Sequence, residues 1–185
     1  MDDDDFEAAL ALALNGDEAA FDAIYRRVQP GLLRYLRGLS VVAAEDLASE
    51  AWFEVVRGLD NFEGDPQGFI AWIFTIARRK TIDRSRYEAR RPITHLTDYE
   101  PHAALVPDPA TIVEQAEGTD AAIALVRTLP PDQAEAILLR VVAGLDIEHV
   151  AELLGKSNGA VRVLTHRGLK RLGATLAHQS VREDV

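Results

Sequence analysis

The sequence predicts an all-α protein of two small helical domains joined by a flexible linker, the second domain containing a helix-turn-helix. Three observations lead to this fold class. Apolar residues make up 48% of the chain and are mostly Ala, Leu, Val and Ile, whereas aromatic residues make up only 6%. This mixture suits helices better than sheets, and no segment alternates apolar and polar residues over the length of a strand. Prolines and scattered polar residues interrupt residues 89–108, which is typical of a linker.

The predicted first domain spans residues 17–88 and follows an acidic tail over residues 1–16. The run Asp2–Asp5 in that tail should be solvated. Asn15-Gly16-Asp17 has the composition of a turn with an N-cap and predicts a helix to about residue 28. Pro30 suits the first position of a second helix, to about residue 39, because the first N–H groups of a helix have no helical partner.

Two longer helices, 44–59 and 69–87, complete this domain, and a polar loop over 60–68 joins them. Each helix has an apolar face that should pack inward. On the first helix this face consists of Ala48, Trp52, Val55, Val56 and Leu59. On the second it consists of Phe69, Ile73, Ile76 and Ala77.

The predicted second domain spans residues 109–176 and is followed by a short tail over 177–185. Its helices begin at capping residues and stop at glycines. They cover 132–143, 147–154 and 158–172, with Asp146 and Ser157 as N-caps and Gly144 and Gly155 as stops. A short helix, a Gly-containing turn and a longer helix form a helix-turn-helix.

The last of these helices divides into two faces at 3.6 residues per turn. The inward face consists of Val161, Leu164, Gly168 and Leu172. The outward face consists of Arg162, Val163, His166, Arg167 and Lys170. Cationic side chains, an imidazole and a methyl-bearing side chain together suit the major groove of DNA. A solvated helix face is the alternative, but it does not explain the preceding short helix and turn.

The net charge of −10 hides two basic segments. Residues 69–91 contain seven basic residues against two acidic ones, and no acidic residue lies between Lys156 and Arg182. The distribution of charge is more informative than its sum. Two separate nucleic-acid contacts are therefore expected, with two solvated helix faces as the alternative.

An adjacent stripe of helix 69–87 contains Trp72, Thr75, Arg79 and Arg86. Rings that stack on bases and cations that pair with phosphates bind single-stranded nucleic acid, although for Trp72 alone a place in the core is the better explanation. The preceding loop, Asn61–Gly68, has the donors and acceptors to hold an unstacked base by its edge. Most polar loops are only connectors, which is the alternative.

Helix 44–59 carries a second kind of surface on its polar side. This side consists of Asp46, Glu50, Phe53, Glu54 and Arg57. One aromatic ring inside a rim of charges is typical of a protein-binding patch, and a singly exposed Phe is the alternative.

Other classes of protein find little support. The chain has no cysteine, no apolar run long enough for a bilayer and no signal peptide, so a cytoplasmic protein is expected. We find no phosphate-binding loop, nucleophile elbow or metal-ligand spacing, and His166 has no second ligand at helical spacing. An enzyme, a metal and a cofactor are therefore not expected. A stand-alone helix-turn-helix regulator is the remaining rival, but it leaves the first domain unexplained.

Several short motifs occur in a characteristic order. They are Glu45–Trp52, Phe69–Arg78 with Ile82-Asp83-Arg84, Leu129–Gln133, Leu139-Arg140, Gly144-Leu145, Ala151–Gly155, Gly159-x-Val161-Arg162 and His166-Arg167. Together these segments resemble the extracytoplasmic-function type of RNA polymerase sigma factor, from about Ala19 to Leu172.

The resemblance implies three sets of contact residues. Core polymerase, through its clamp, would bind Asp46, Leu47, Glu50, Phe53, Glu54 and Arg57. The minus-ten promoter element would contact Asn61, Phe62, Gly64, Asp65, Trp72, Thr75, Arg78, Arg79 and Arg86. The minus-thirty-five duplex would contact Ser157, Asn158, Arg162, Val163, His166, Arg167 and Lys170.

The resemblance also implies that the second domain binds the polymerase flap, that the linker passes near the active-site channel, and that an anti-sigma protein is a partner. The sequence departs from the family at three places. Val163-Leu164 stands where many members have Ser-Arg, His149 stands where an acid is common, and Asp2–Asp5 lies outside the pattern.

Overall fold

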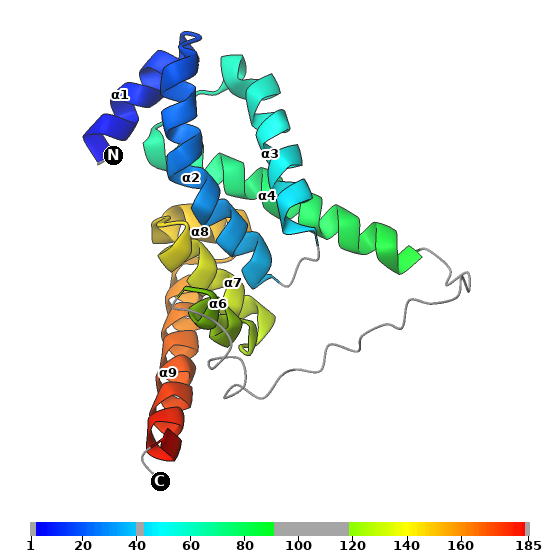
Figure 1. The fold of residues 1–185 in the computed structure, drawn as a ribbon, viewed down its shortest axis with the longest axis vertical. Helices are drawn as coiled ribbons and strands as arrows, with labels where there is room; N and C mark the ends of the chain where they lie inside the picture. Colours follow the sequence, from blue (N-terminus) through cyan, green and yellow to red (C-terminus); the bar gives the residue numbers. More distant parts are fainter. Residues whose placement is uncertain (1–2, 40–42, 91–118, 184–185) are drawn as a thin grey trace.

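The computed structural model describes residues 3–39, 43–90 and 119–183, with the backbone alone at 119 and 178–183. The described parts of the chain are helical, with no strand among them (Figure 1), which confirms the all-α class. Most of the predicted linker, 89–108, and the beginning of the predicted second domain lie outside the described residues.

The first helix, α1 (Asp3–Leu14), corrects the prediction of a solvated tail over 1–16. Phe6, Leu10 and Ala13 are buried, at the spacing that places them on one side of a helix. The helix packs against α2 and α4. Its exposed aspartates occupy the first turn, where negative charge stabilises a helix. The acidic run therefore begins a packed element.

Helix α2 (Glu18–Gly38) is continuous, whereas the sequence predicted two helices separated near Pro30. Asp17 is the N-cap, as predicted: its Oδ1 accepts a hydrogen bond from the Ala20 N–H at 2.8 Å. Pro30 lies inside the helix but on its exposed side, so its ring meets solvent and not the packed core. Buried residues before and after it, such as Ile24 and Leu32, hold the helix together across the missing hydrogen bond.

Helix α3 (Ala44–Gly58) is followed by the short turn η1 (Leu59–Asn61). Of its predicted apolar face, Ala48, Trp52 and Val55 are buried. Val56 is 54% exposed, and this part of the prediction was wrong. Neighbouring residues of a helix lie about 100° apart, so only one of the two valines can face the core.

Helix α4 (Pro66–Arg90) begins earlier and ends later than the predicted 69–87. Asp65 caps it, since its Oδ1 accepts a hydrogen bond from the Gly68 N–H at 2.7 Å. The predicted inward face was correct, because Phe69, Ile73, Ile76 and Ala77 are all buried.

The second part of the fold contains α6 (Thr119–Arg127), α7 (Pro131–Ile137), η2 (Leu138–Val142), α8 (Ile147–Leu154) and α9 (Asn158–Glu183). The predicted helix 132–143 is α7 continued by the wider π turn of η2. Both predicted stops are glycines with positive φ, +72° at Gly144 and +63° at Gly155, a conformation that only glycine adopts without strain. Asp146 and Ser157 cap α8 and α9 as predicted.

Helix α9 continues to Glu183, well beyond the predicted end at 172 and through most of the predicted tail, 177–185. After Gly173 the segment contains neither glycine nor proline as far as residue 183, so no strong stop signal ends the helix there. In Figure 1 this part of α9 projects away from the rest of the molecule.

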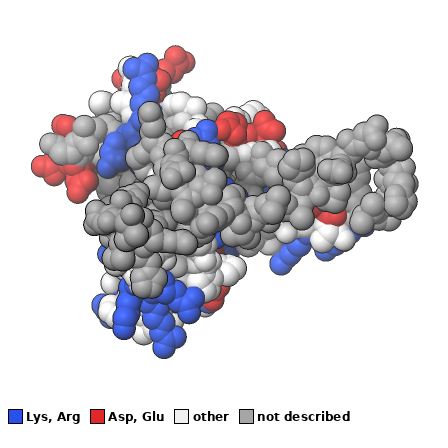
Figure 2. All heavy atoms as spheres, turned by 60° about the horizontal axis from the view of Figure 1, so that its bottom comes forward, with Lys and Arg blue, Asp and Glu red and all other residues white. Residues whose placement is uncertain are grey.

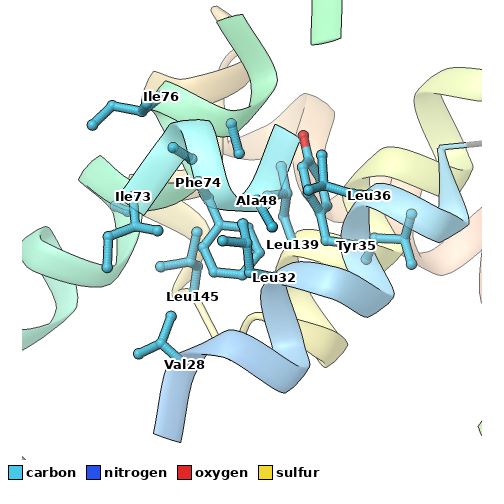
Figure 3. Packing of buried hydrophobic residues seen from close by; sticks show 14 of the residues in the cluster. Val28, Leu32, Tyr35, Leu36, Ala48, Ile73, Phe74, Ile76, Leu139 and Leu145 are labelled. Atoms are coloured by element: carbon cyan, nitrogen blue, oxygen red, sulfur yellow. The ribbon is translucent and has the colours of Figure 1, made fainter. Parts of the chain in front are cut away.

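The two predicted domains pack against each other. Leu139 and Leu145 of the second domain lie among Leu32, Tyr35 and Phe74 of the first, and all five are fully buried (Figure 3). Helix α2 contacts α6, α7 and η2, and α4 contacts α8. The domains therefore share one hydrophobic core in this structure.

Candidate nucleic-acid interface

The loop before α4 is held by aromatic contacts. The rings of Phe62 and Trp72 stack with centroids 5.3 Å apart and planes inclined by 27°. Phe62 also meets Phe69 edge-on at 5.0 Å. A Cβ at Gly64 would lie 2.9 Å from Cζ of Phe62, so glycine allows the loop to fold back over the ring. Trp72 is half-buried and packs on the core, which supports its structural role and leaves only part of its ring accessible.

Two polar side chains of the predicted minus-ten set are already engaged within α4. The Asp65 carboxylate caps the helix. The Thr75 hydroxyl donates a hydrogen bond to the Ala71 carbonyl at 2.8 Å. Asn61 remains exposed and is the side chain of the loop best placed to meet a ligand.

Two exposed arginines of α4, Arg79 and Arg86, are accompanied by carboxylates. Arg79 forms an ion pair with Glu54 of α3, and Arg86 lies 3.9 Å from Asp83. The hydrogen bond from Arg79 lowers the pKa of Glu54, and a further one from Lys80 adds to the effect. Part of the basic segment recognised in the sequence is therefore neutralised by α3.

Arg78 does not lie with the other predicted minus-ten residues. Its position on the helix is about 100° from that of Arg79, and its side chain is turned toward the second domain. There its Nε donates a hydrogen bond to Oε1 of Glu135 at 2.7 Å, and the Tyr35 hydroxyl donates to the same oxygen at 3.1 Å. In this structure Arg78 forms a contact between the domains and lies apart from the exposed surface of the other predicted minus-ten residues.

The polar side of α3 forms the second candidate surface. Asp46, Glu50, Phe53 and Arg57 are exposed, with Phe53 at 67%. The guanidinium carbon of Arg57 lies 5.9 Å from the centre of the Phe53 ring. These residues border a hollow of about 350 Å³ lined by Glu50, Phe53, Glu54, Arg57, Gly58 and Lys80.

Leu47 is corrected as a predicted surface contact, because only 2% of it is exposed. It lies one helical turn from Ala51, which is also buried. Leu47 therefore supports the surface from beneath.

The predicted reading face of α9 is exposed along its whole length. Arg162, Val163, His166, Arg167 and Lys170 are all exposed, as are Ser157 and Asn158. The opposite face packs inward: Val161 is fully buried, and a Cβ at Gly168 would lie 2.5 Å from Cδ1 of Ile137. The predicted division of this helix into two faces was correct.

The cations of α9 differ from those of α4 in their surroundings. Within the described residues, no carboxylate lies within ion-pair distance of Arg162, Arg167 or Lys170. Lys156, before the helix, is by contrast paired with Asp132 at 3.0 Å. Figure 2 shows a group of Lys and Arg at the lower edge of the view, whereas most visible Asp and Glu, together with other Lys and Arg, lie in its upper half. The reading face thus has uncompensated positive charge.

Sequence reasoning missed Glu135 and Tyr35. Glu135 lies on α7, a helix to which the sequence analysis assigned no contact, and its partner Arg78 is 57 residues away. No short-range pattern identifies a contact at that separation. Among the described residues, no cluster of His, Asp and Glu could hold a metal ion, and no helix is long and apolar enough to cross a membrane.

Two family models match the chain, one within each of the two helical parts of the fold. The model of Sigma-70 region 2 matches residues 24–91, and that of Sigma-70 region 4 matches residues 119–172. The ECF RNA polymerase sigma factor ShbA of Streptomyces griseus is 35% identical over 181 residues, which cover 90% of this chain and 92% of ShbA. SigD of Mycobacterium tuberculosis is 29% identical over 178 residues, covering 93% and 84%.

Solved structures support the fold. CnrH, in complex with the cytosolic domain of CnrY, superposes with a TM-score of 0.63 at 24% identity, over 94% of this chain and 98% of CnrH. RpoE of Bartonella quintana, in complex with the anti-sigma factor NepR, gives 0.62 at 23% identity, over 85% and 96%.

Two helical units, one with a mixed aromatic and basic helix and one with a helix-turn-helix, define a promoter-binding protein. The chain belongs to the extracytoplasmic-function (ECF) family of RNA polymerase sigma factors. It binds core polymerase and directs it to promoters, and the family resemblance of the sequence is thereby confirmed.

Proposed function

We propose that the three predicted residue sets divide this work between the two domains. Helix α3 binds the clamp of core polymerase, the loop before α4 and the exposed side of α4 engage the minus-ten strand, and α9 reads the minus-thirty-five duplex. The second domain also binds the polymerase flap. The observation that carries the proposal is the contrast between the uncompensated cations of α9 and the neutralised ones of α4.

The chemistry of α9 fits duplex DNA. Free guanidinium groups such as those of Arg162 and Arg167 can bind guanine in the major groove, and the Val163 methyl groups can contact thymine. The Ser157 hydroxyl accepts a hydrogen bond from the Ala160 N–H as an N-cap, which leaves the N–H groups of Asn158 and Gly159 in the first turn to favour a phosphate. The Ser-Arg pair common in the family is replaced here by Val163-Leu164, and Leu164 is half-buried. We therefore assign no base contact to Leu164.

The minus-ten surface is too small to open DNA alone. Opening costs ~1.4 kcal/mol per base-pair step, or about 14 kcal/mol for a bubble on the order of ten steps. A captured base returns ~1–3 kcal/mol, so two or three captured bases would return less than opening costs. The net charge of −10 and the Arg79–Glu54 pair weaken attraction to DNA further. Core polymerase must supply the remaining free energy.

Permanganate footprinting tests this division of labour. Thymines of the minus-ten region should react only when both this protein and core polymerase are present. Asp46→Arg with Glu50→Arg should abolish that reactivity and core binding, because both side chains are exposed on the proposed clamp surface. The control is Glu18→Arg with Asp22→Arg, an equal charge change on the exposed side of α2.

Strong reactivity with the free protein would contradict the proposal. So would normal core binding by the α3 variant when its circular dichroism spectrum is unchanged.

An anti-sigma protein is a further proposed partner. RpoE of Bartonella quintana was solved in complex with the anti-sigma factor NepR, and CnrH was solved in complex with the cytosolic domain of CnrY. A hollow of about 480 Å³ between α3 and α4, lined by Leu47, Glu50, Lys80, Asp83, Arg84, Tyr87 and Glu88, offers a surface for it. The exposed Tyr87 ring within a charged rim suits a protein contact. We propose that the protein acts in the cytoplasm and catalyses no reaction of its own.

A further inference from the structure

We infer that the packed arrangement of the two domains is an autoinhibited form, and that Glu135 is the latch that holds it closed. This inference rests on the proposed division of promoter contacts between the domains. The latch consists of Glu135 on α7 together with its two partners in the first domain, Tyr35 on α2 and Arg78 on α4.

The hydrogen bonds of the latch are of a strong kind. Arg78 and Glu135 form an ion pair at 2.7 Å whose side chains are only 30% and 15% exposed. Charge-assisted bonds of this sort are about twice as strong as neutral ones and are less screened than surface pairs. Burial and the neighbouring Glu135 raise the pKa of Tyr35 well above its usual value, so its hydroxyl keeps the proton that it donates.

Apolar packing surrounds the latch. A Cβ at Gly38 of α2 would lie 2.7 Å from the methyl carbons of Leu138, and one at Gly31 would lie 3.3 Å from the Val142 carbonyl oxygen. These glycines let η2 approach the backbone of α2 closely. The shared core of Leu139 and Leu145 with the first domain lies beside them.

Promoter binding requires the domains to separate. The minus-ten and minus-thirty-five elements are roughly 25 base pairs apart, which is about 85 Å at ~3.4 Å per pair. In this structure α9 lies close to the first domain. Gly168 of α9 packs on Ile137 of α7, and the next residue, Leu138, packs on Gly38 of α2. A molecule closed in this way cannot reach both elements at once.

The latch also occupies a cation that DNA would use. The Glu135 carboxylate takes the place that a backbone phosphate would take on Arg78. When the domains separate and bind DNA, the Arg78 guanidinium exchanges the Glu135 carboxylate for a DNA phosphate. Closure and minus-ten binding by Arg78 are therefore mutually exclusive.

Energy transfer between two dyes measures the closed form directly. The chain has no native cysteine, so Glu18→Cys and Glu152→Cys, both exposed and outside the proposed interfaces, label one site in each domain. The unaltered latch should give high transfer that falls when core polymerase is added. Glu135→Lys places a like charge beside Arg78 and should lower transfer in the free protein.

Two further variants separate the latch from a folding defect. Glu148→Lys makes the same charge change at an exposed position of α8 in the second domain, and Glu148 is not among the groups that act on Arg78, so transfer should stay high. Arg78→Glu combined with Glu135→Lys rebuilds the pair with reversed charges and should restore transfer. A misfolded second domain would not be rescued by a change on α4.

The inhibitory role is tested by affinity. Glu135→Lys should bind core polymerase about tenfold more tightly than the parent protein, because the apparent dissociation constant varies inversely with the open fraction. Unchanged transfer in this variant overturns the latch, and lowered transfer with unchanged affinity overturns autoinhibition. Failure of the proposed function would differ from both, since the parent protein would then show no core-dependent footprint.

Discussion

At the scale of single residues, Asp146 shows how one side chain fixes the geometry of the helix-turn-helix. Its carboxylate accepts a hydrogen bond from the His149 N–H at 2.9 Å, and the His149 imidazole Nδ1 lies 3.0 Å away. These contacts, led by the backbone hydrogen bond, lower the pKa of Asp146. The family's usual acid is absent at position 149, so Asp146 alone provides the cap.

Asp146→Ala should therefore lower the free energy of unfolding by about 0.5–2 kcal/mol at neutral pH. A lowered pKa in the folded state stabilises the protein above the pKa of the unfolded chain, and that contribution is lost as the pH falls through the folded value. The difference between variant and parent should shrink from about pH 4 downward. Urea unfolding at neutral and acidic pH checks this, and a difference that stays constant with pH would contradict it.

The three caps at Asp17, Asp146 and Ser157 were predictable because each depends on residues within one turn. The partner of Arg78 was not predictable. Either a DNA phosphate or the Glu135 carboxylate, 57 residues away, could pair with it, and the sequence shows the same basic segment in either case. Leu47 was misplaced for a different reason: a motif carried over from a family includes residues that support a surface as well as residues that form it.

At the scale of elements, α9 combines a buried anchor with an exposed reader. Arg162→Ala and Lys170→Ala should each weaken promoter binding, by about 1–3 kcal/mol for a bidentate base contact and less for a phosphate contact. Loss of a phosphate contact should also reduce the slope of log affinity against log salt by about one unit. Fluorescence anisotropy with holoenzyme and a promoter duplex over a range of salt measures both.

Arg26→Ala is the matched control, because this exposed arginine of α2 is paired with Asp22 and lies outside the reading helix. Its affinity and salt slope should equal those of the parent. If both α9 variants also behave like the parent at every salt concentration, α9 is not the reader of the duplex.

Helix boundaries were less predictable than helix faces. The sequence predicts that Pro30 begins a helix, but burial on both sides of it outweighs one lost hydrogen bond. The acidic run before Phe6 obscured the apolar spacing that folds α1. Local residue preferences led to both predictions, whereas tertiary packing decided the structure.

At the scale of the whole molecule, the sequence predicted two domains but not that they share a core. The contact depends on shape, since Gly31 and Gly38 leave room for η2. The sequence does not show which element packs against a glycine within a helix. Amphipathic patterning shows that a face is buried and leaves its partner unspecified.

Gly38→Ala tests the closeness of this packing. The added methyl group would meet fully buried Leu138, which cannot move away freely, so the free energy of unfolding should fall by about 1–3 kcal/mol. Gly173→Ala on α9 is the control, because nothing lies within 4 Å of its added Cβ; it should raise stability by about 0.5–1 kcal/mol. Equal unfolding midpoints for the two variants would contradict the close approach.

The shared core has a consequence for how the chain is made. The face of α2 that receives Leu139 and Leu145 is complete on the ribosome before those leucines exist, because about 100 residues separate Gly38 from Leu145. At ~5–20 residues per second, the nascent first domain carries an uncovered apolar face for roughly 5–20 s. During that interval it is a substrate for chaperones, and the arrival of the second domain ends its exposure.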